Sequence, residues 1–434
     1  MMAVRLGHPT TGGRASLEST LSELDAKRLI FDHSLSRDRV GRIGVELEWL
    51  VLPVDDPARR AGPEELAEVD RLAGRILPDG GQVSWEPGGQ LELSGLPYAS
   101  LQGCIDSAAA DLAVLRGRAR EAGMRLVGAG LDQRPPRFSV ALPRYQALKR
   151  CYAHLGSAGD ALLCNTASVQ VNVDAGDGSD GWRGRSRRWQ IANSLGPLLM
   201  AVFANSPVLE VRGSREVTAL SGRQLLRFRA DRFRNGPLPS GSDPRGVWTR
   251  YALDAQVMAI RQEDSGPAGD RSALWEPAPA GLSLRRWLRG TGPRAVHVDD
   301  VFHHLKSLVP PVRACGHLEL RMLDAQGGDD WMVPVAVVAA LLDDEVTSDS
   351  VASLLGHAAP SPTRQDWVDA ARHGLADPEL GDLARTVIRL ALAGLRRLGV
   401  SPEVFGAVER FAEIHTLRGL SPAQLRLPNH MAVA

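Results

Sequence analysis

The clearest hydrophobic pattern in the sequence is the alternation of glutamates with apolar residues in the stretch 44–51. Read with the period of two that a β-strand requires, it places Glu46 and Glu48 on one face. The opposite face is formed by Val45, Leu47, Trp49 and Val51. A strand with so apolar a back packs against a core, and burying two neighbouring carboxylates without partners is costly. The pattern therefore predicts a strand whose acidic face meets positive charge.

The same alternation returns in three later segments, in which polar residues alternate with leucine or valine. The polar positions are Gln90, Glu92 and Ser94; Ser168, Gln170, Asn172 and Asp174; and His317, Glu319 and Arg321. Four strands of this kind predict one sheet with an apolar back and a polar front. Such a front is typical of an enzyme.

Helical periodicity surrounds these strands. We expect a strand over residues 124–130 and helices over 16–31, 63–77, 100–123, 145–152, 186–204 and 380–399. The chain is helical in character after residue 340. These patterns predict an α+β fold, in which helices back a largely antiparallel sheet and the C-terminal third is helical.

Nothing in the sequence divides the chain into separate domains. Its 434 residues contain no internal repeat and no sharp change in composition. We therefore predict a single domain over residues 1–434, with a core over 40–340 and a helical part over 341–434. Two stretches, 236–246 and 263–281, are expected to be irregular, and lids or plain surface loops are equally compatible with them.

Charge and composition exclude several classes of function. The 51 basic residues balance the 51 acidic ones, so nothing points to nucleic acid or an anionic membrane as a partner. No segment approaches the roughly 20 apolar residues of a membrane span, and the first residues lack the apolar run of a signal peptide. The four cysteines form no CxxC pair, which suits a reducing compartment. We therefore expect a cytoplasmic location.

Five glutamates fall near the polar front of the predicted sheet. They are Glu46, Glu48, Glu86, Glu92 and Glu319. So many carboxylates cannot stay ionised in one cleft unless cations neutralise them, and hard oxygen ligands select Mg²⁺, Mn²⁺ or Ca²⁺ rather than zinc. A single Glu-x-Glu strand is more often a solvated sheet face, but four such strands together favour a metal site.

A nucleotide would fit this arrangement, because Mg²⁺ held by a few carboxylates usually completes its shell with water and substrate phosphates. Arg321 lies on the same face as Glu319 and could neutralise a phosphate, although a simple ion pair is an equally good interpretation. The sequence contains no GxxxxGK[ST] loop and no GxGxxG opening a βα unit. If ATP binds, metals and arginines must hold it.

Several longer motifs run through the predicted sheet in a fixed order. They are Glu86-Pro-Gly-Gly-Gln-Leu-Glu-Leu-Ser-Gly95, Pro143-Arg-Tyr, Thr166-Ala-Ser-Val-Gln-Val-Asn-Val-Asp174, Phe203-Ala-Asn-Ser-Pro207, Ser221-Gly-Arg223 and His317-Leu-Glu-Leu-Arg321. Together they resemble the motifs of the plant-type glutamate–cysteine ligases over roughly residues 40–340. The size and the Arg-rich, Lys-poor composition are most similar to the actinobacterial branch, which serves ergothioneine biosynthesis.

This resemblance implies a glutamine-synthetase-like half-barrel of antiparallel strands. It also implies a reaction in which ATP phosphorylates the γ-carboxylate of L-glutamate and the amine of L-cysteine then displaces phosphate. Two or more Mg²⁺ ions, or Mn²⁺, would take part. The implied ligands are Glu46, Gln170 and Glu319 for one ion, and Glu48, Glu86 and Glu92 for the other.

The resemblance also implies roles for three further residues. Arg321 would stabilise the phosphoryl group in transfer, Arg223 would grip the α-carboxylate of glutamate, and Asn172 would contact substrate. It implies nothing readable about the cysteine pocket or the C-terminal helices.

Two alternatives stay open. One is a carboxylate–amine ligase of the same fold that joins glutamate to a different amine, since only the acceptor pocket separates the two. The other is a non-catalytic metabolite-binding protein built on a ligase fold. The intact set of five glutamates argues against the second alternative.

Overall fold

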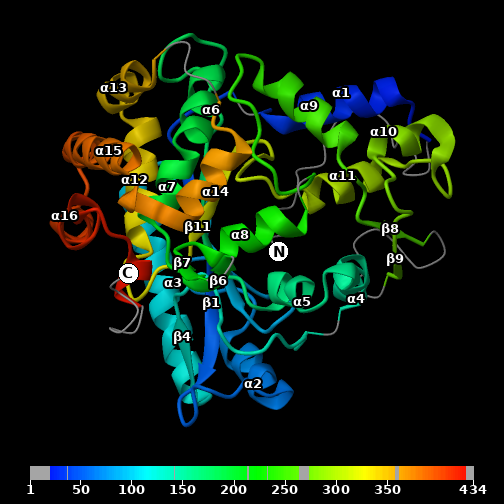
Figure 1. Ribbon diagram of the computed structural model, residues 1–434, viewed down its shortest axis with the longest axis horizontal. Helices are drawn as coiled ribbons and strands as arrows, with labels where there is room; N and C mark the ends of the chain where they lie inside the picture. Colours follow the sequence, from blue (N-terminus) through cyan, green and yellow to red (C-terminus); the bar gives the residue numbers. More distant parts are fainter. Residues whose placement is uncertain are drawn as a thin grey trace.

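A seven-stranded sheet runs through the middle of the protein (Figure 1). The computed structural model describes residues 20–36, 38–140, 142–212, 215–231, 233–262, 273–356 and 361–426. The strands follow the order β10–β11–β5–β1–β3–β2, with β4 pairing with the second half of β1, and each pairing is antiparallel. Their bounds are β1 Ile43–Pro53, β2 Gln82–Trp85, β3 Leu91–Ser94, β4 Met124–Val127, β5 Ser168–Val173, β10 Val312–Ala314 and β11 Leu318–Asp324. The four predicted polar-fronted strands are neighbours in this sheet, as expected.

The apolar back of the sheet is covered by three helices, α3 (Leu101–Glu121), α7 (Gly196–Val202) and α12 (Met332–Asp343). Val45 and Leu47 of β1 are each 1% exposed beneath them. Burying one such side chain stabilises the fold by about 1.5–3 kcal/mol. A register slip of one residue would turn the glutamates of β1 into this core, so burial of the back fixes which side chains face forward.

The remaining elements before the C-terminal third are helices and two small strand pairs. They are α1 Glu23–Ser34, α2 Pro63–Ala73, α4 Pro143–Tyr152, α5 Ser157–Cys164, α6 Arg185–Ser194, α8 Gly222–Ala230, α9 Pro244–Asp254, α10 Leu284–Arg286, α11 Val298–Ser307, β6 Val208–Arg212 with β7 Arg215–Ala219, and β8 Ala259–Arg261 with β9 Trp275–Pro277. Short turns of helix occur at η1 Ala153–Leu155 and η2 Trp287–Thr291. In Figure 1 the elements α9, α10, α11, β8 and β9 lie to the right of the sheet.

The C-terminal third is helical, as the sequence predicts. It contains α12, α13 Glu345–Leu355, α14 Arg364–His373, η3 Gly374–Ala376, α15 Pro378–Arg397, α16 Pro402–Ile414, η4 Thr416–Arg418 and α17 Pro422–Leu425. Helices α13, α15 and α16 pack on α12 at the left of Figure 1, away from the front of the sheet. They therefore extend the core behind the sheet.

Several predicted boundaries differ from the structure. The helix predicted over 186–204 is two helices, because Pro197 cannot donate a helical hydrogen bond and Gly196 packs closely against the Trp367 ring. The helix predicted over 16–31 ends at Ser34, and residues 16–19 lie outside the described residues. Sequence reasoning missed strand β2 and the pairs β6–β7 and β8–β9. Of the stretch 263–281, residues 263–272 lie outside the described residues.

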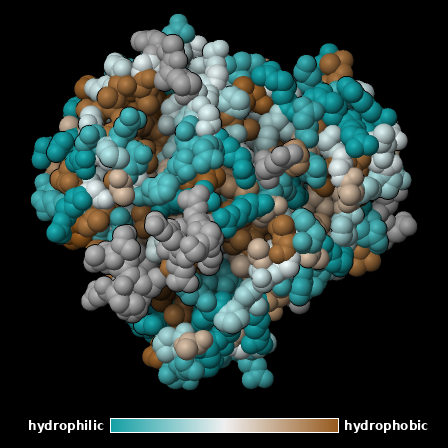
Figure 2. Space-filling view, viewed as in Figure 1, coloured by the Kyte–Doolittle hydropathy of each residue, from teal (hydrophilic) through white to brown (hydrophobic). Residues whose placement is uncertain are grey.

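The face in Figure 2 mixes hydrophilic and hydrophobic residues, with the hydrophobic ones in separate groups. Across the described ranges, no helix is both long and apolar enough to cross a membrane.

Candidate active site

A cavity of about 490 Å³ lies on the polar front of the sheet. Strands β1, β3, β5 and β11 form one wall, and residues of α4 and α11 contribute to the other. Of the nine predicted site residues, eight line this cavity: Glu46, Glu48, Glu86, Glu92, Gln170, Asn172, Glu319 and Arg321. The fold thus gathers side chains that are up to 275 positions apart in the sequence, from Glu46 to Arg321.

Strand pairing sets the order of the acidic side chains across the sheet. Glu48 lies directly opposite Glu92, and Glu46 lies opposite Gln170. On the next strand, Glu319 lies opposite Asn172. Directly opposed side chains on paired strands lie about 5 Å apart at their β-carbons, so like charges placed in this way repel strongly.

Burial and mutual repulsion disfavour the charged form of three of the glutamates. The pKa of Glu46 is raised from 4.5 to about 8, mainly by burial and then by the carboxylates of Glu319 and Glu92. Burial also raises the pKa of Glu48 and of Glu86, and the neighbouring carboxylate of Glu92 acts in the same direction. The acidic front therefore holds negative charge poorly without a cation.

Glu319 differs from the other glutamates because two arginines surround it. Burial alone would raise its pKa, but the guanidinium groups of Arg313 and Arg321 lower it to about 2. Arg313 Nη2 donates to Glu319 Oε1 at 2.7 Å, and Arg321 Nη1 lies 3.1 Å from Oε2. Glu319 is therefore ionised at neutral pH and holds Arg321 at the cavity wall.

The two amides on β5 connect the acidic strands. Gln170 Nε2 donates to Glu48 Oε1 at 2.8 Å, and its Oε1 accepts a hydrogen bond from Arg321. Asn172 Nδ2 lies 3.4 Å from Glu46 Oε1, and Asn172 Oδ1 is 2.9 Å from His317 Nε2. Gln170, expected beside Glu46, thus bonds to Glu48 instead and lies between the two predicted ligand sets.

The donor set suits a hard divalent cation. Carboxylate and amide oxygens are the ligands that Mg²⁺ and Mn²⁺ prefer, and a bound cation would offset the repulsion that raises the pKa of Glu46. Within the described ranges, no three His, Cys, Asp or Glu side chains meet closely enough to hold a metal as they stand. Arginine and amide groups occupy several of the carboxylate oxygens instead.

Arg223 is the predicted site residue that does not line the cavity. It is 1% exposed, and its Nη2 donates to the backbone carbonyl of Arg321 at 2.9 Å. Its Nη1 lies 3.5 Å from Asp324 Oδ1. From this position Arg223 supports the strand that carries Arg321, and the position does not fit the predicted grip on a substrate carboxylate.

Sequence reasoning missed most of the positive charge around the cavity. The basic residues that line it besides Arg321 are Arg39, Arg42, Arg144, Arg227, Lys306 and Arg313. Burial lowers the pKa of Arg144, Arg227 and Lys306, as expected for cations held away from water. Single basic residues on separate helices carry no periodic signal, and only Arg144 fell within a recognised motif, Pro143-Arg-Tyr.

Comparison with solved structures supports the fold. A glutamate–cysteine ligase from Francisella tularensis, solved in complex with AMP, aligns with a TM-score of 0.50 at 14% identity, over 89% of this chain and 84% of that one. A bifunctional glutathione synthetase from Pasteurella multocida also aligns at 0.50, with 12% identity, over 94% of this chain and 51% of that one. At these identities the match concerns the fold alone, which is the expected glutamine-synthetase-like one.

Sequence comparison is more specific. The glutamate–cysteine ligase EgtA of Mycobacterium tuberculosis is 38% identical over 409 residues, which are 92% of this chain and 88% of that protein. The chloroplastic glutamate–cysteine ligase of Arabidopsis thaliana is 28% identical over 397 residues, 85% of this chain and 69% of that one. The family model of glutamate–cysteine ligase family 2 matches residues 42–427. The chain belongs to glutamate–cysteine ligase family 2.

Proposed function

We propose that this protein joins L-glutamate to L-cysteine at the expense of ATP, forming γ-glutamylcysteine, ADP and phosphate. The observation that carries the proposal is the cavity at the front of the sheet, whose lining brings five glutamates together with Arg321 and other arginines. Membership of the glutamate–cysteine ligase family and the names of the mycobacterial and plant relatives support it. By the same similarity, we propose that the product enters an ergothioneine-type thiol pathway and that residues 1–434 act as one domain.

The proposed reaction has two steps. A γ-carboxylate oxygen of glutamate attacks the γ-phosphorus of ATP, and ADP leaves with the electrons of the broken P–O bond. The cysteine amine then attacks the acyl carbon, phosphate leaves, and the amine loses a proton. Transfers of this kind depend on positioning and on charge stabilisation more than on covalent chemistry by the protein.

Arg321 has the clearest task among the groups of the chain. Its guanidinium reaches the cavity between Glu319 and Gln170, and we propose that it stabilises the charge that develops on the moving phosphoryl group. Glu319 keeps this guanidinium in place, and Arg223 fixes the backbone carbonyl of the same residue. Asn172, which bonds to His317 and faces Glu46, is proposed to contact substrate.

Divalent cations, which we propose to be Mg²⁺ or Mn²⁺, would neutralise the nucleotide phosphates when bound. We propose that Glu46, Gln170 and Glu319 hold one ion and that Glu48, Glu86 and Glu92 hold the other. The raised pKa of Glu46, Glu48 and Glu86 supports this assignment, because a cation beside each carboxyl group would stabilise its ionised form.

A coupled assay of ADP release tests the proposal. With ATP and glutamate present, L-cysteine should support turnover, whereas glycine, methylamine and ammonia should support little. Equal rates with the other amines would favour the alternative ligase, and no ADP release with any amine would favour a non-catalytic binding protein.

Two variants test the proposed ligands in the same assay. Glu46→Ala and Glu319→Ala should abolish turnover, while the far-ultraviolet circular dichroism stays that of the folded protein. Glu68→Ala is the matched control, because Glu68 lies on the surface of α2 in an exposed pair with Arg71. Retained turnover in both test variants would refute the metal assignment.

A further inference from the structure

The turn between β2 and β3 carries Glu86 into the cavity, and its shape depends on two glycines. Within the turn, Glu86 N donates to Gln90 O at 2.9 Å and Gly89 N donates to Glu86 O at 3.0 Å. Gly89 has a φ of +85°, which other residues rarely adopt. A Cβ on Gly88 would lie 2.1 Å from the carbonyl oxygen of Cys164, so the turn lies tightly against the segment before β5.

The side chain of Gln90 fastens this turn to that segment. Its Oε1 accepts a hydrogen bond from Gly88 N at 3.0 Å, and its Nε2 donates to Thr166 O at 2.9 Å. Gln90 is 3% exposed, so water cannot replace these bonds. Leaving a buried backbone group unpaired costs about 1–3 kcal/mol. The Gln90 amide therefore strongly favours the arrangement in which it bonds to both Gly88 N and Thr166 O.

The carbonyl groups on both sides of Glu86 are also bonded. The backbone N–H groups of Ser139 and Val140 donate to Pro87 O at 2.8 and 3.1 Å. On the other side, Tyr145 Oη donates to Trp85 O at 2.9 Å. The backbone around Glu86 is therefore held from three directions.

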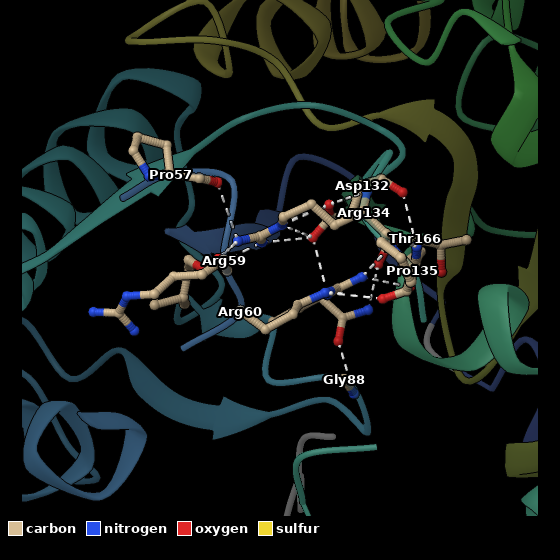
Figure 3. A network of polar contacts seen from close by, with 11 residues as sticks. Pro57, Arg59, Arg60, Gly88, Asp132, Arg134, Pro135 and Thr166 are labelled. Carbon is tan, nitrogen blue, oxygen red and sulfur yellow. Dashed lines mark hydrogen bonds and ion pairs between the residues drawn. The ribbon is translucent and has the colours of Figure 1, made fainter. Parts of the chain in front are cut away.

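A buried charge network fixes the segment to which Gln90 is fastened (Figure 3). Asp132 lies between Arg60 at 2.9 Å and Arg134 at 2.7 Å. Asn165 accepts a hydrogen bond from Arg60 at 2.9 Å and donates to the carbonyl groups of Asp132 and Arg134 at 2.8 and 2.7 Å. Because Asn165 directly precedes Thr166, this network sets the position of the carbonyl that receives the Gln90 amide.

The carboxylate of Glu86 itself makes no hydrogen bond or ion pair to another described residue. Its direction therefore depends on the backbone of the turn. We propose that Gln90 is a positioning residue that aims Glu86 at its cation and thereby sets the affinity of that one ion site. The inference rests on the proposed function, because it assumes that Glu86 is a metal ligand.

Binding of Mn²⁺, measured through the electron paramagnetic resonance signal of the free ion, tests the inference without activity as the readout. Gln90→Met keeps the length of the side chain but removes both hydrogen bonds. Partners of metal ligands typically contribute 10- to 100-fold to affinity, so one of the two Mn²⁺ sites should weaken by about that factor. Glu86→Gln should weaken the same site.

Gln326→Met is the matched control. Gln326 is 1% exposed, donates to the carbonyl groups of Phe203 and Asp324 at 2.8 and 2.9 Å, and does not line the cavity. This variant should lose a similar amount of thermal stability while both Mn²⁺ sites keep the wild-type affinity.

The results of these measurements distinguish the positioning role of Gln90 from the assignment of Glu86 as a metal ligand. Wild-type affinity at both sites in Gln90→Met, or an equal loss in Gln326→Met, would overturn the role of Gln90 and leave the metal assignment standing. A wild-type protein that binds no Mn²⁺ would overturn both.

Discussion

Cation binding to this protein should release protons, because the acidic front is partly protonated without a cation. The pKa of Glu46 is about 8, raised by burial first and then by the carboxylates of Glu319 and Glu92. At pH 7 a group with this pKa is about nine-tenths protonated, and a divalent cation must displace that proton. The pKa of Glu86, raised to about 7, adds about half a proton, and the pKa of Glu48 is shifted in the same direction. Saturation with Mg²⁺ at pH 7 should therefore release about one proton or somewhat more per chain.

Isothermal titration calorimetry measures this release. The heat of Mg²⁺ binding is compared in two buffers of different ionisation enthalpy, and the difference gives the number of protons. At pH 9 the contribution of Glu46 should fall to about a tenth of a proton. Glu46→Gln should lower the release at pH 7 by about one proton. A release near zero at pH 7, or one that Glu46→Gln does not change, would refute the reasoning.

The raised pKa of Glu46 also predicts how the stability of the protein depends on pH. A carboxyl group with a raised folded-state pKa contributes stability that is present below its unfolded value of 4.5 and is lost as pH rises to about 8. The shift is opposite for Glu319, but its pKa of about 2 places its effect below pH 4.5. Urea unfolding in EDTA should thus show a lower free energy of unfolding at pH 8 than at pH 5, by a few kcal/mol, with Mg²⁺ restoring part of it. Equal or greater stability at pH 8 in EDTA would contradict this.

Three further predictions follow from single side chains. Arg321→Ala should lower kcat by about 100-fold or more in the ADP-release assay and leave the folded structure intact, whereas a change confined to KM would contradict its proposed role. Gly88→Ala should lower both turnover and Mn²⁺ affinity, since its Cβ would meet the Cys164 carbonyl group at 2.1 Å; wild-type values would show that the turn can shift freely. Asp132→Asn should destabilise the protein by about 3–5 kcal/mol in urea unfolding, because it removes the buried negative charge between Arg60 and Arg134, whose side chains are only 12% exposed. A loss under 1 kcal/mol would show that these charges are well solvated.

The sheet could be predicted from the sequence because one physical rule determines it. Alternation of valine and leucine with polar residues predicts which face of each strand is buried. Burial of that face then fixes the register, which places Glu48 opposite Glu92. The predicted glutamates therefore meet at one cavity. Gln170 already fell within this alternation, and Glu86 lies just before the Pro-Gly-Gly turn; the resemblance added only their assignment to particular metal ions.

The opposite wall of the cavity could not be predicted, because it depends on tertiary packing. Arg144 and Lys306 lie 162 positions apart on separate helices, and no local pattern in either helix predicts that both side chains line the same cavity. Arg223 shows the converse case. A motif pointed to it as a substrate-binding residue, but the turn from β7 into α8 buries its guanidinium against the backbone of β11. A motif gives a residue's neighbours in sequence and does not give the direction of its side chain.

In the proposed reaction, glutamate is activated as an acyl phosphate before the amine attacks. This activation is tested most directly with L-glutamate labelled with ¹⁸O in the γ-carboxylate, in the presence of ATP, Mg²⁺ and L-cysteine. One ¹⁸O atom per turnover should appear in the released phosphate, detected by mass spectrometry, together with γ-glutamylcysteine. Formation of the dipeptide without ¹⁸O in phosphate would rule out the acyl phosphate intermediate.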